Sequence, residues 1–228
     1  MNTKTDSQYY TVDDDWLASY CAGGLSAAKR FVLNCQVAIN PHLSKRVETL
    51  ETVGGVLLES AKGEPLSDNF MSRIFTQIDT PNAPLAEATY SNEHSSKSQL
   101  DGWVPAPLVD FLKRENTPLK WKNIGFGVAR IPLLQEGREK LYLLKSKPGL
   151  KMPLHSHYGE EWALILQGGY HVGTEGYTRG DVHREDESCT HRPIIDDHGE
   201  PCITLVASEG GVKFSNPTLK LMKPILGI

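Results

Sequence analysis

Residues 149–168, GLKMPLHSHYGEEWALILQG, contain the strongest functional pattern in the chain. His155 and His157 are two residues apart, and Glu161 follows four residues later. Successive side chains of a β-strand point to opposite faces, so these three residues of equal parity would share one face. In a strand of a barrel they would point inside. Two imidazoles and one carboxylate on one side form a facial ligand set for a divalent metal ion.

A fourth ligand would come from another part of the chain. The downstream segment GDVHREDESCTHRP, at 180–193, contains two candidates, His183 and His191. Either could be a solvent-exposed loop residue, and the spacing does not choose between them. A single histidine is weak evidence for a metal, but the joint pattern of ligand-type residues at strand parity is far stronger. The ligand chemistry alone admits zinc, manganese, iron, nickel or cobalt.

From Trp103 onward the sequence is typical of β-structure. Short apolar or alternating runs recur, separated by Gly, Pro, Asn and Asp, and one helix is expected at 108–114. This spacing predicts a sandwich or barrel of antiparallel strands. Trp162, Leu164 and Leu166 have the opposite parity from the candidate ligands, so we expect them to pack against a second layer or a dimer partner.

The N-terminal part is helical in pattern. Residues 13–62 are predicted to form three helices, bounded by Gly23-Gly24 and by Asn40-Pro41, and a short fourth helix is predicted at 66–78. The aspartates at 13–15 are N-cap candidates for the first helix. Residues 79–100 are rich in Pro, Ser, Thr and Asn and are predicted to be a linker.

Composition excludes several classes of protein. The 228 residues are 39% hydrophobic and 23% charged, which is ordinary for a globular protein. The four cysteines are too scattered for a disulfide framework, no apolar run is long enough to span a bilayer, and the polar start does not resemble a signal peptide. The net charge is −4, with the acidic excess in the first 95 residues. We therefore predict a cytoplasmic protein with no direct DNA binding and no membrane contact.

The spacing of Gly149, His155, His157, Glu161 and Gly168 resembles the first cupin motif throughout, whereas only the turn at 180–181 resembles the second motif. A narrower resemblance, to the ChrR family of anti-sigma factors, covers nearly the whole chain. It is carried by YCAGGLS at 20–26, VETLETVGGVLLE at 47–59, WVPAPLVDFL at 103–112, HSHYGEEWALILQG at 155–168, GDVHREDESCTHRP at 180–193, GEPCITLVASEGGVKF at 199–214 and LMKPILGI at 221–228.

This resemblance implies an α+β chain: a helical anti-sigma-like domain at 1–78, a linker at 79–100, and a cupin domain at 101–228, a double-stranded β-helix or jelly-roll barrel. It also implies that His155, His157, Glu161 and His191 correspond to the family's cupin zinc ligands, which favours zinc. The implied role is stress-responsive transcription regulation. The helical domain would bind an extracytoplasmic-function (ECF) sigma factor, and the cupin would sense a signal through its metal or a small-molecule ligand.

The chain departs from the family in its helical part. The family holds a second zinc there, but Gln36, Asn40 and Leu43 occupy three of the ligand positions, and no histidine precedes His42. Cys35 is expected to be a small buried thiol. We predict no zinc in this domain, so its helices would depend on apolar packing, with help from a homodimer or from the cupin.

Two alternatives to the regulator remain open. A metal-dependent cupin dioxygenase or related enzyme would need an open coordination position, with Glu161 as a ligand or a base, although no catalytic residue is assigned. A structural metal in a binding module is the other alternative. Cys189 could be a redox-responsive thiol, but an inert cysteine is more common. His171, His183 and His198 are expected at the surface or behind the ligands.

Overall fold

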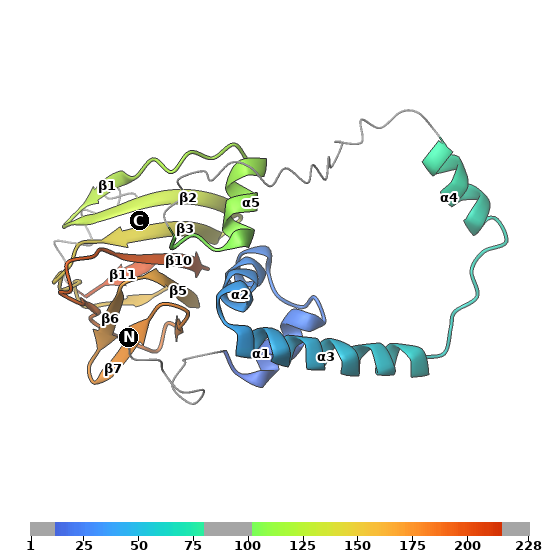
Figure 1. Ribbon diagram of the computed structural model, residues 1–228, viewed down its shortest axis with the longest axis horizontal. Coiled ribbons are helices and arrows are strands. Elements are labelled where there is room, and N and C mark those ends of the chain that lie inside the picture. Colours follow the sequence, from blue (N-terminus) through green and yellow to red (C-terminus); the bar gives the residue numbers. More distant parts are fainter. Residues whose placement is uncertain (1–11, 80–101, 216–228) are drawn as a thin grey trace. The chain divides into compact units, whose positions relative to one another are not determined.

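The computed structural model describes residues 12–79 and 102–215 (Figure 1). These residues fall into two compact units, one made of 12–54 with 102–215 and the other of 55–79. The predicted linker lies outside the described residues except for its first residue, and so does the C-terminal segment at 221–228. Within the described ranges, no helix combines the length and apolar character that crossing a membrane requires.

Five helices form where the sequence predicts them. Ser26 caps the second helix by accepting a hydrogen bond from the Lys29 backbone N–H, and Asn40 caps the third by accepting from the N–H groups of His42 and Leu43. Asp13 occupies the N-cap position of the first helix, but its carboxylate binds Arg184 of the β-domain instead. The helices are α1 (Asp14–Cys21), α2 (Ala27–Ile39), α3 (Pro41–Ser60), α4 (Phe70–Asp79) and α5 (Ala106–Arg114).

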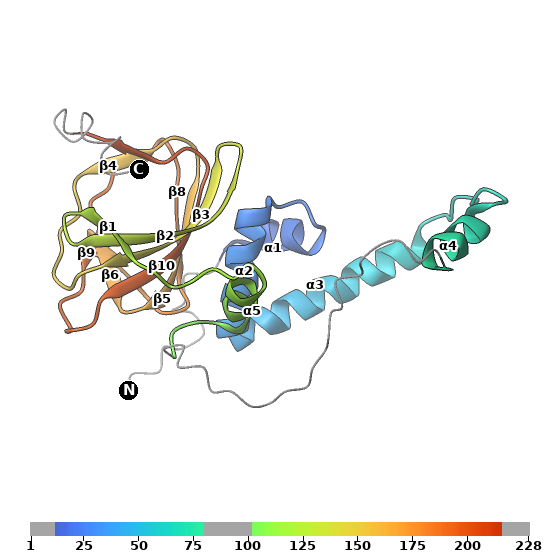
Figure 2. The same ribbon diagram turned by 90° about the horizontal axis from the view of Figure 1, so that it is seen from above.

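The β-domain consists of antiparallel strands that form a barrel-like wall (Figure 2). Residues from all of its sheets line a cavity in its interior. One sheet has six strands, in the order β1 (Lys122–Gly125), β2 (Val128–Glu136), β3 (Glu139–Ser146), β10 (Cys202–Ser208), β5 (Glu161–Gln167), β8 (Val182–Glu185). Two smaller sheets complete the wall: β11 (Val212–Phe214) with β4 (His155–His157), and β7 (Glu175–Thr178), β6 (Gly169–Val172), β9 (Ile194–Ile195). The predicted order, helices followed by an antiparallel β-domain, is confirmed.

The N-terminal helices are the second layer expected beside Trp162, Leu164 and Leu166. All three side chains are fully buried in one cluster with apolar residues of α1, α2 and α3. The rings of Trp162 and of Trp16 from α1 pack perpendicular to each other, with 4.9 Å between ring centroids. Helix α2 packs on the outer face of β3, β5 and β10. The six-stranded sheet therefore has the cavity on one face and helices on the other.

Gln36, Asn40 and Leu43, which stand where the family resemblance implies zinc ligands, have structural roles of their own. The buried Gln36 side chain donates its Nε2–H to the carbonyl of Gly180, at 3.0 Å. Asn40 caps α3, and Leu43 is buried in the helical core beside Cys35. Contact with the β-domain, capping and apolar packing thus hold α2 and the start of α3, and the expected help comes from the cupin part of the chain.

Candidate metal centre

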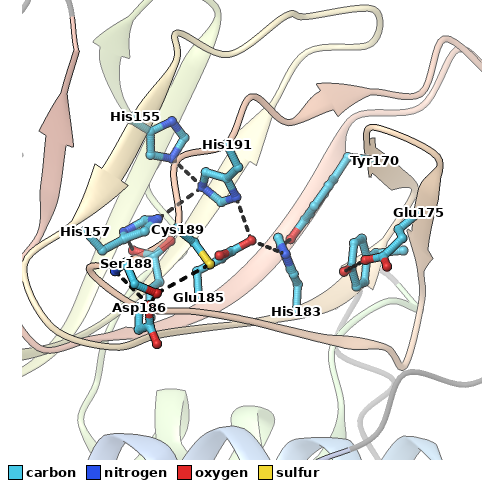
Figure 3. Close-up of polar contacts among 12 residues, drawn as sticks. His155, His157, Tyr170, Glu175, His183, Glu185, Asp186, Ser188, Cys189 and His191 are labelled. Carbon is cyan, nitrogen blue, oxygen red and sulfur yellow. Dashed lines mark hydrogen bonds and ion pairs between the residues drawn. The ribbon is translucent and has the colours of Figure 1, made fainter.

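Three imidazoles converge inside the β-domain (Figure 3). His155 and His157 lie on β4 and point to the same side, as their parity predicts. His191 lies opposite His155, and the two residues exchange backbone hydrogen bonds of 3.0 and 2.9 Å. The Nε2 atom of His191 is 3.0 Å from Nε2 of His155 and 3.1 Å from Nε2 of His157. Local strand geometry and long-range pairing together build this cluster.

The neutral tautomers of two of these rings follow from their outer partners. Nδ1 of His155 lies 2.7 Å from the carbonyl oxygen of Pro153, and Nδ1 of His191 lies 3.0 Å from a carboxylate oxygen of Glu185. Both partners are acceptors, so in the neutral form of each ring Nδ1 carries the proton and Nε2 carries a lone pair. With both rings neutral, the two Nε2 lone pairs face each other at 3.0 Å and cannot form a hydrogen bond.

A cation satisfies this arrangement. Two ligand nitrogens bound to one zinc ion at about 2.1 Å lie roughly 3.0–3.4 Å apart, for bond angles between 90° and the tetrahedral value. The Nε2 separations of 3.0 and 3.1 Å agree with this geometry. The outer hydrogen bonds to Pro153 and Glu185 are the kind that orient metal-binding imidazoles. The residues present therefore fit a divalent metal ion.

Glu161 lies beside the cluster rather than within it. Its Oε2 atom is 3.4 Å from Nδ1 of His157 and accepts a hydrogen bond of 3.2 Å from the Tyr142 hydroxyl. Its carboxylate lines the same cavity as His155 and His191. Among the described residues, two groups have ligand atoms within 4.8 Å of one another: the three histidines His155, His157 and His191, and a second group of His183, Glu185 and His191. Glu161 belongs to neither group. The structure thus brings together three of the four predicted residues and places the fourth next to them.

Glu185 belongs to the candidate site, although the sequence pattern did not single it out. Its carboxylate accepts from Nδ1 of His191 at 3.0 Å and from Nε2 of His183 at 2.7 Å. His183 in turn contacts the Tyr170 hydroxyl through Nδ1, at 2.9 Å. His183, the rival ligand, therefore lies behind Glu185 (Figure 3). The equal parity of His183 and Glu185 indicates that they share one face of a short strand. Which face this is, and what it contacts, depends on the pairing of β8 with β5.

Burial and hydrogen bonding set the charges of the cluster. Burial lowers the pKa of His155 to about 4, which keeps this imidazole neutral at neutral pH. Burial also opposes protonation of His157, but the Glu161 carboxylate outweighs it and raises the pKa. Burial would raise the pKa of Glu185, yet hydrogen bonds from His183 and His191 hold it well below its ordinary value. Glu185 is therefore a carboxylate, and His155 offers an uncharged donor.

Neither cysteine near the centre has the character of a reactive thiolate. Cys189 is exposed, and its hydrogen bond to Glu185 raises its pKa. Cys202 lines the cavity wall from β10, and burial raises its pKa to about 12. A raised pKa reduces the thiolate fraction at neutral pH. The expectation that Cys202 belongs to the core is confirmed by its burial.

These features define a class of protein: an N-terminal helical segment joined to a cupin-like domain with a candidate metal centre. The ChrR Cupin-like domain family matches residues 114–209. The chain is 30% identical over 217 residues to the Anti-sigma-E factor ChrR of Cereibacter sphaeroides, covering 95% of this chain and 97% of that protein. It also resembles the crystal structure of Rhodobacter sphaeroides SigE in complex with the anti-sigma ChrR, with a TM-score of 0.69, 29% identity and coverage of 87% of this chain and 98% of that chain.

The chain therefore belongs to the ChrR family of anti-sigma factors. Both the predicted family and the predicted fold class, helices followed by a cupin domain, are confirmed.

Proposed function

We propose that this protein binds an ECF sigma factor through its N-terminal helices and responds to a signal through a metal-bearing cupin domain. A ChrR protein with which it shares 29% identity over most of its length was crystallised in complex with SigE. The observation on this chain that carries the proposal is a row of exposed apolar side chains on α4. Such a row is unfavourable in water and is typical of a helix that binds a partner.

The exposed side chains of α4 follow helical spacing. Phe70, Ile74 and Ile78 recur every four residues and form one stripe, and Met71 and Phe75 form the adjacent stripe. Between 37% and 71% of each side chain is exposed. Amphipathic helices of this kind bind in hydrophobic grooves through anchors at i, i+4 and i+8. The apolar residues Val56, Leu57, Leu58 and Leu66 are exposed as well.

The proposed metal site consists of His155, His157 and His191, with Glu161 as the fourth ligand and one divalent ion per chain. The facing lone pairs of His155 and His191 support a cation there. Zinc is favoured because imidazole and carboxylate suit it and because the family resemblance points to it; manganese, iron, nickel and cobalt are compatible.

The alternation of strands β5 and β8 supports a route from this site to the helices. Glu161 and Glu185 line the cavity on the inner face of the sheet. The adjacent residue on each strand, Trp162 on β5 and Arg184 on β8, lies on the outer face. There the guanidinium carbon of Arg184 is 4.9 Å from the ring centroid of Trp16. A shift of either strand at the metal site would therefore move the contacts that hold α1 on the barrel.

The sigma-binding role is tested by co-expression of the full chain with each ECF sigma factor encoded by the same genome. We expect one of them to co-purify with the chain as a stable complex. Failure to form a complex with any of them would reject this role.

Measurement of the metal content tests the proposed metal site in the cupin domain. Mass spectrometry on protein purified without added metal should find one equivalent per chain. His155→Ala should lose it, whereas His198→Ala, a change at an exposed histidine, should retain it. Equal metal content in the two variants would contradict the assignment.

A metal-dependent oxygenase remains a second candidate because a cavity adjoins the histidines. Oxygen consumption by the iron-loaded protein in the presence of a diketone or flavonol would favour it.

A further inference from the structure

The interior of the barrel contains a cavity of about 130 Å³. Polar groups gather on one wall, where His155, Glu161, Glu185 and His191 lie. The remaining surface is mostly apolar, although the hydroxyl-bearing residues Ser146 and Thr204 also line it, and it is contributed by both the six-stranded sheet and the smaller sheets. Its lining includes Val128, Leu144, Ala163, Ile195, Val206 and Phe214. An occupant would therefore meet charged and imidazole groups at one end and mostly apolar side chains elsewhere.

The size of the cavity limits the occupant. An apolar protein cavity of roughly 150 Å³ stays dry and accommodates benzene. The cavity here is comparable, so it suits a molecule of roughly six to eight non-hydrogen atoms. Because most of the lining cannot hydrogen-bond, a ligand with several polar groups would lose more hydration than the cavity could replace.

The charges on the polar wall indicate an uncharged ligand. Glu161 and Glu185 are the carboxylates that line the cavity, and together they balance the two charges of a divalent cation. Arg130 stacks on the ring of Tyr142, at 4.0 Å from the centroid, but it does not line the cavity. An anionic ligand would add an unbalanced charge in a buried site, which is costly. A neutral oxygen donor avoids this cost.

The turn between β1 and β2 places an aromatic residue at the cavity. Phe126 lines it and is nevertheless 51% exposed, so it lies between the cavity and solvent. Its φ is 54°, between Gly125 at 97° and Gly127 at 80°. A bulky residue in this backbone region is strained, and such strain persists where the surrounding structure imposes it, often at ligand sites. Phe126 is therefore placed to cover the entrance.

We propose, building on the signal-responsive cupin domain proposed above, that this cavity binds a small, uncharged, largely apolar molecule that presents one ketone or alcohol oxygen to the histidine wall. The oxygen end lies against the wall formed by His155 and His191. The hydrocarbon end contacts Leu144 and Val206, and Phe126 covers the entrance.

Isothermal titration calorimetry on the full chain with one equivalent of zinc tests this ligand class. The probes are cyclohexanone, cyclohexane and cyclohexanecarboxylate, which share one ring and differ in the polar group. We expect one cyclohexanone per chain, bound at least about tenfold more tightly than either of the others, a difference of roughly 1.4 kcal/mol. Absence of saturable cyclohexanone binding, or equal binding of the carboxylate, would overturn the proposal.

Two variants locate the binding. Val206→Phe fills the cavity and should weaken cyclohexanone binding at least about tenfold. Phe126→Ala changes an exposed side chain and should preserve the fold while it accelerates both association and dissociation in stopped-flow measurements. Phe75→Ala, at an exposed phenylalanine of α4, is the matched control and should change neither rate. If Phe126→Ala changes neither rate constant and Val206→Phe does not change the affinity, the ligand binds outside this cavity.

Metal content measured on the same samples separates the two proposals. Zinc-loaded protein without cyclohexanone binding rejects the ligand and leaves the metal site standing. Protein that binds cyclohexanone in preference to the carboxylate but retains no zinc rejects the metal site and supports the cavity ligand, since two carboxylates on the wall still exclude an anion.

Discussion

At the scale of single residues, the proposed metal centre depends on which nitrogen of each histidine carries a proton. Pro153 and Glu185 accept from the Nδ1 atoms of His155 and His191, so the Nε2 lone pairs of both rings are directed toward the same point. Such outer partners commonly tune metal affinity without touching the metal. Glu185 is thus a positioning residue, and it holds His183 as well as His191.

Replacement of Glu185 tests this positioning role. Glu185→Gln retains the shape but loses the charge that fixes the proton on Nδ1 of His191. We expect metal affinity to fall by about 10–100-fold, the usual effect of losing such a partner, while saturating zinc still restores one equivalent. Competition with a chromophoric chelator measures the affinity. Glu187→Gln, an exposed change two residues away, is the control, and equal affinities of the two variants would contradict the role.

At the scale of elements, one lysine links α2 to two loops of the barrel. The Lys29 ammonium lies 2.5 Å from a Glu160 oxygen and 2.6 Å from a Glu209 oxygen, and only 9% of its side chain is exposed. Burial lowers the pKa of Lys29, but the two carboxylates outweigh burial and raise it. Burial raises the pKa of Glu209, but the hydrogen bond from Lys29 outweighs that effect and lowers it.

Lys29→Met should destabilise the protein by about 1–2 kcal/mol at neutral pH, because the ion pairs are only partly buried. The Lys29 contribution is present below its ordinary pKa of 10.5 and is lost as pH rises through the raised value. The Glu209 contribution is present above 4.5 and is lost as pH falls through the lowered value. The difference from wild type in urea denaturation should therefore be largest between these limits.

Lys45→Met, at an exposed lysine of α3, is the matched control and should change stability little. A stability difference for Lys29→Met that stays constant from acid to alkaline pH would show that these ion pairs do not hold α2 on the barrel.

The apolar stripes of α4 make a separate prediction. Phe75→Glu places a charge at the centre of the exposed apolar row and should weaken binding of the cognate sigma factor at least about tenfold. The stability of the free protein should change little because 55% of Phe75 is already exposed. Gln77→Glu adds the same charge at a neighbouring exposed position and should leave affinity nearly unchanged. Surface plasmon resonance measures both; equal affinities would exclude α4 from the interface.

At the scale of the whole molecule, the helical segment and the cupin domain share one hydrophobic core. Residues of α1, α2 and α3 belong to the same buried cluster as Leu141, Leu164 and Leu205 of the six-stranded sheet. Loss of order around the metal should therefore reach the helices through direct packing. Strand β5 contributes Glu161 to the proposed metal site and also packs against α2, so the two halves should unfold together.

Removal of the metal tests this coupling. A metal ion whose free concentration is 1,000 times its dissociation constant stabilises the native state by about 4 kcal/mol. Chelation should therefore lower the melting temperature measured by calorimetry. We expect a single transition that shifts as a whole, and zinc should restore it. His155→Ala should be insensitive to the chelator. A separate helical transition that chelation leaves in place would contradict the shared core.

Local physics made much of the molecule predictable from its sequence. Alternation of side chains in a strand places His155 and His157 on one side and Trp162 on the other, irrespective of what the strand contacts. Ser26 and Asn40 mark helix starts because their side chains satisfy backbone N–H groups within three residues. Five helices and a region of antiparallel strands followed from such patterns.

Only the tertiary structure decided which distant residues meet. The sequence left His183 and His191 equivalent by spacing, and the backbone pairing of His191 with His155 brings one of them to the cluster. The pairing of β8 with β5 sets Glu185 across from Glu161, and the packing of α2 on the barrel gives Gln36 a hydrogen-bond partner in Gly180. Strand parity and capping act over a few residues, whereas these contacts join segments separated by about twenty residues or more and depend on the whole barrel closing.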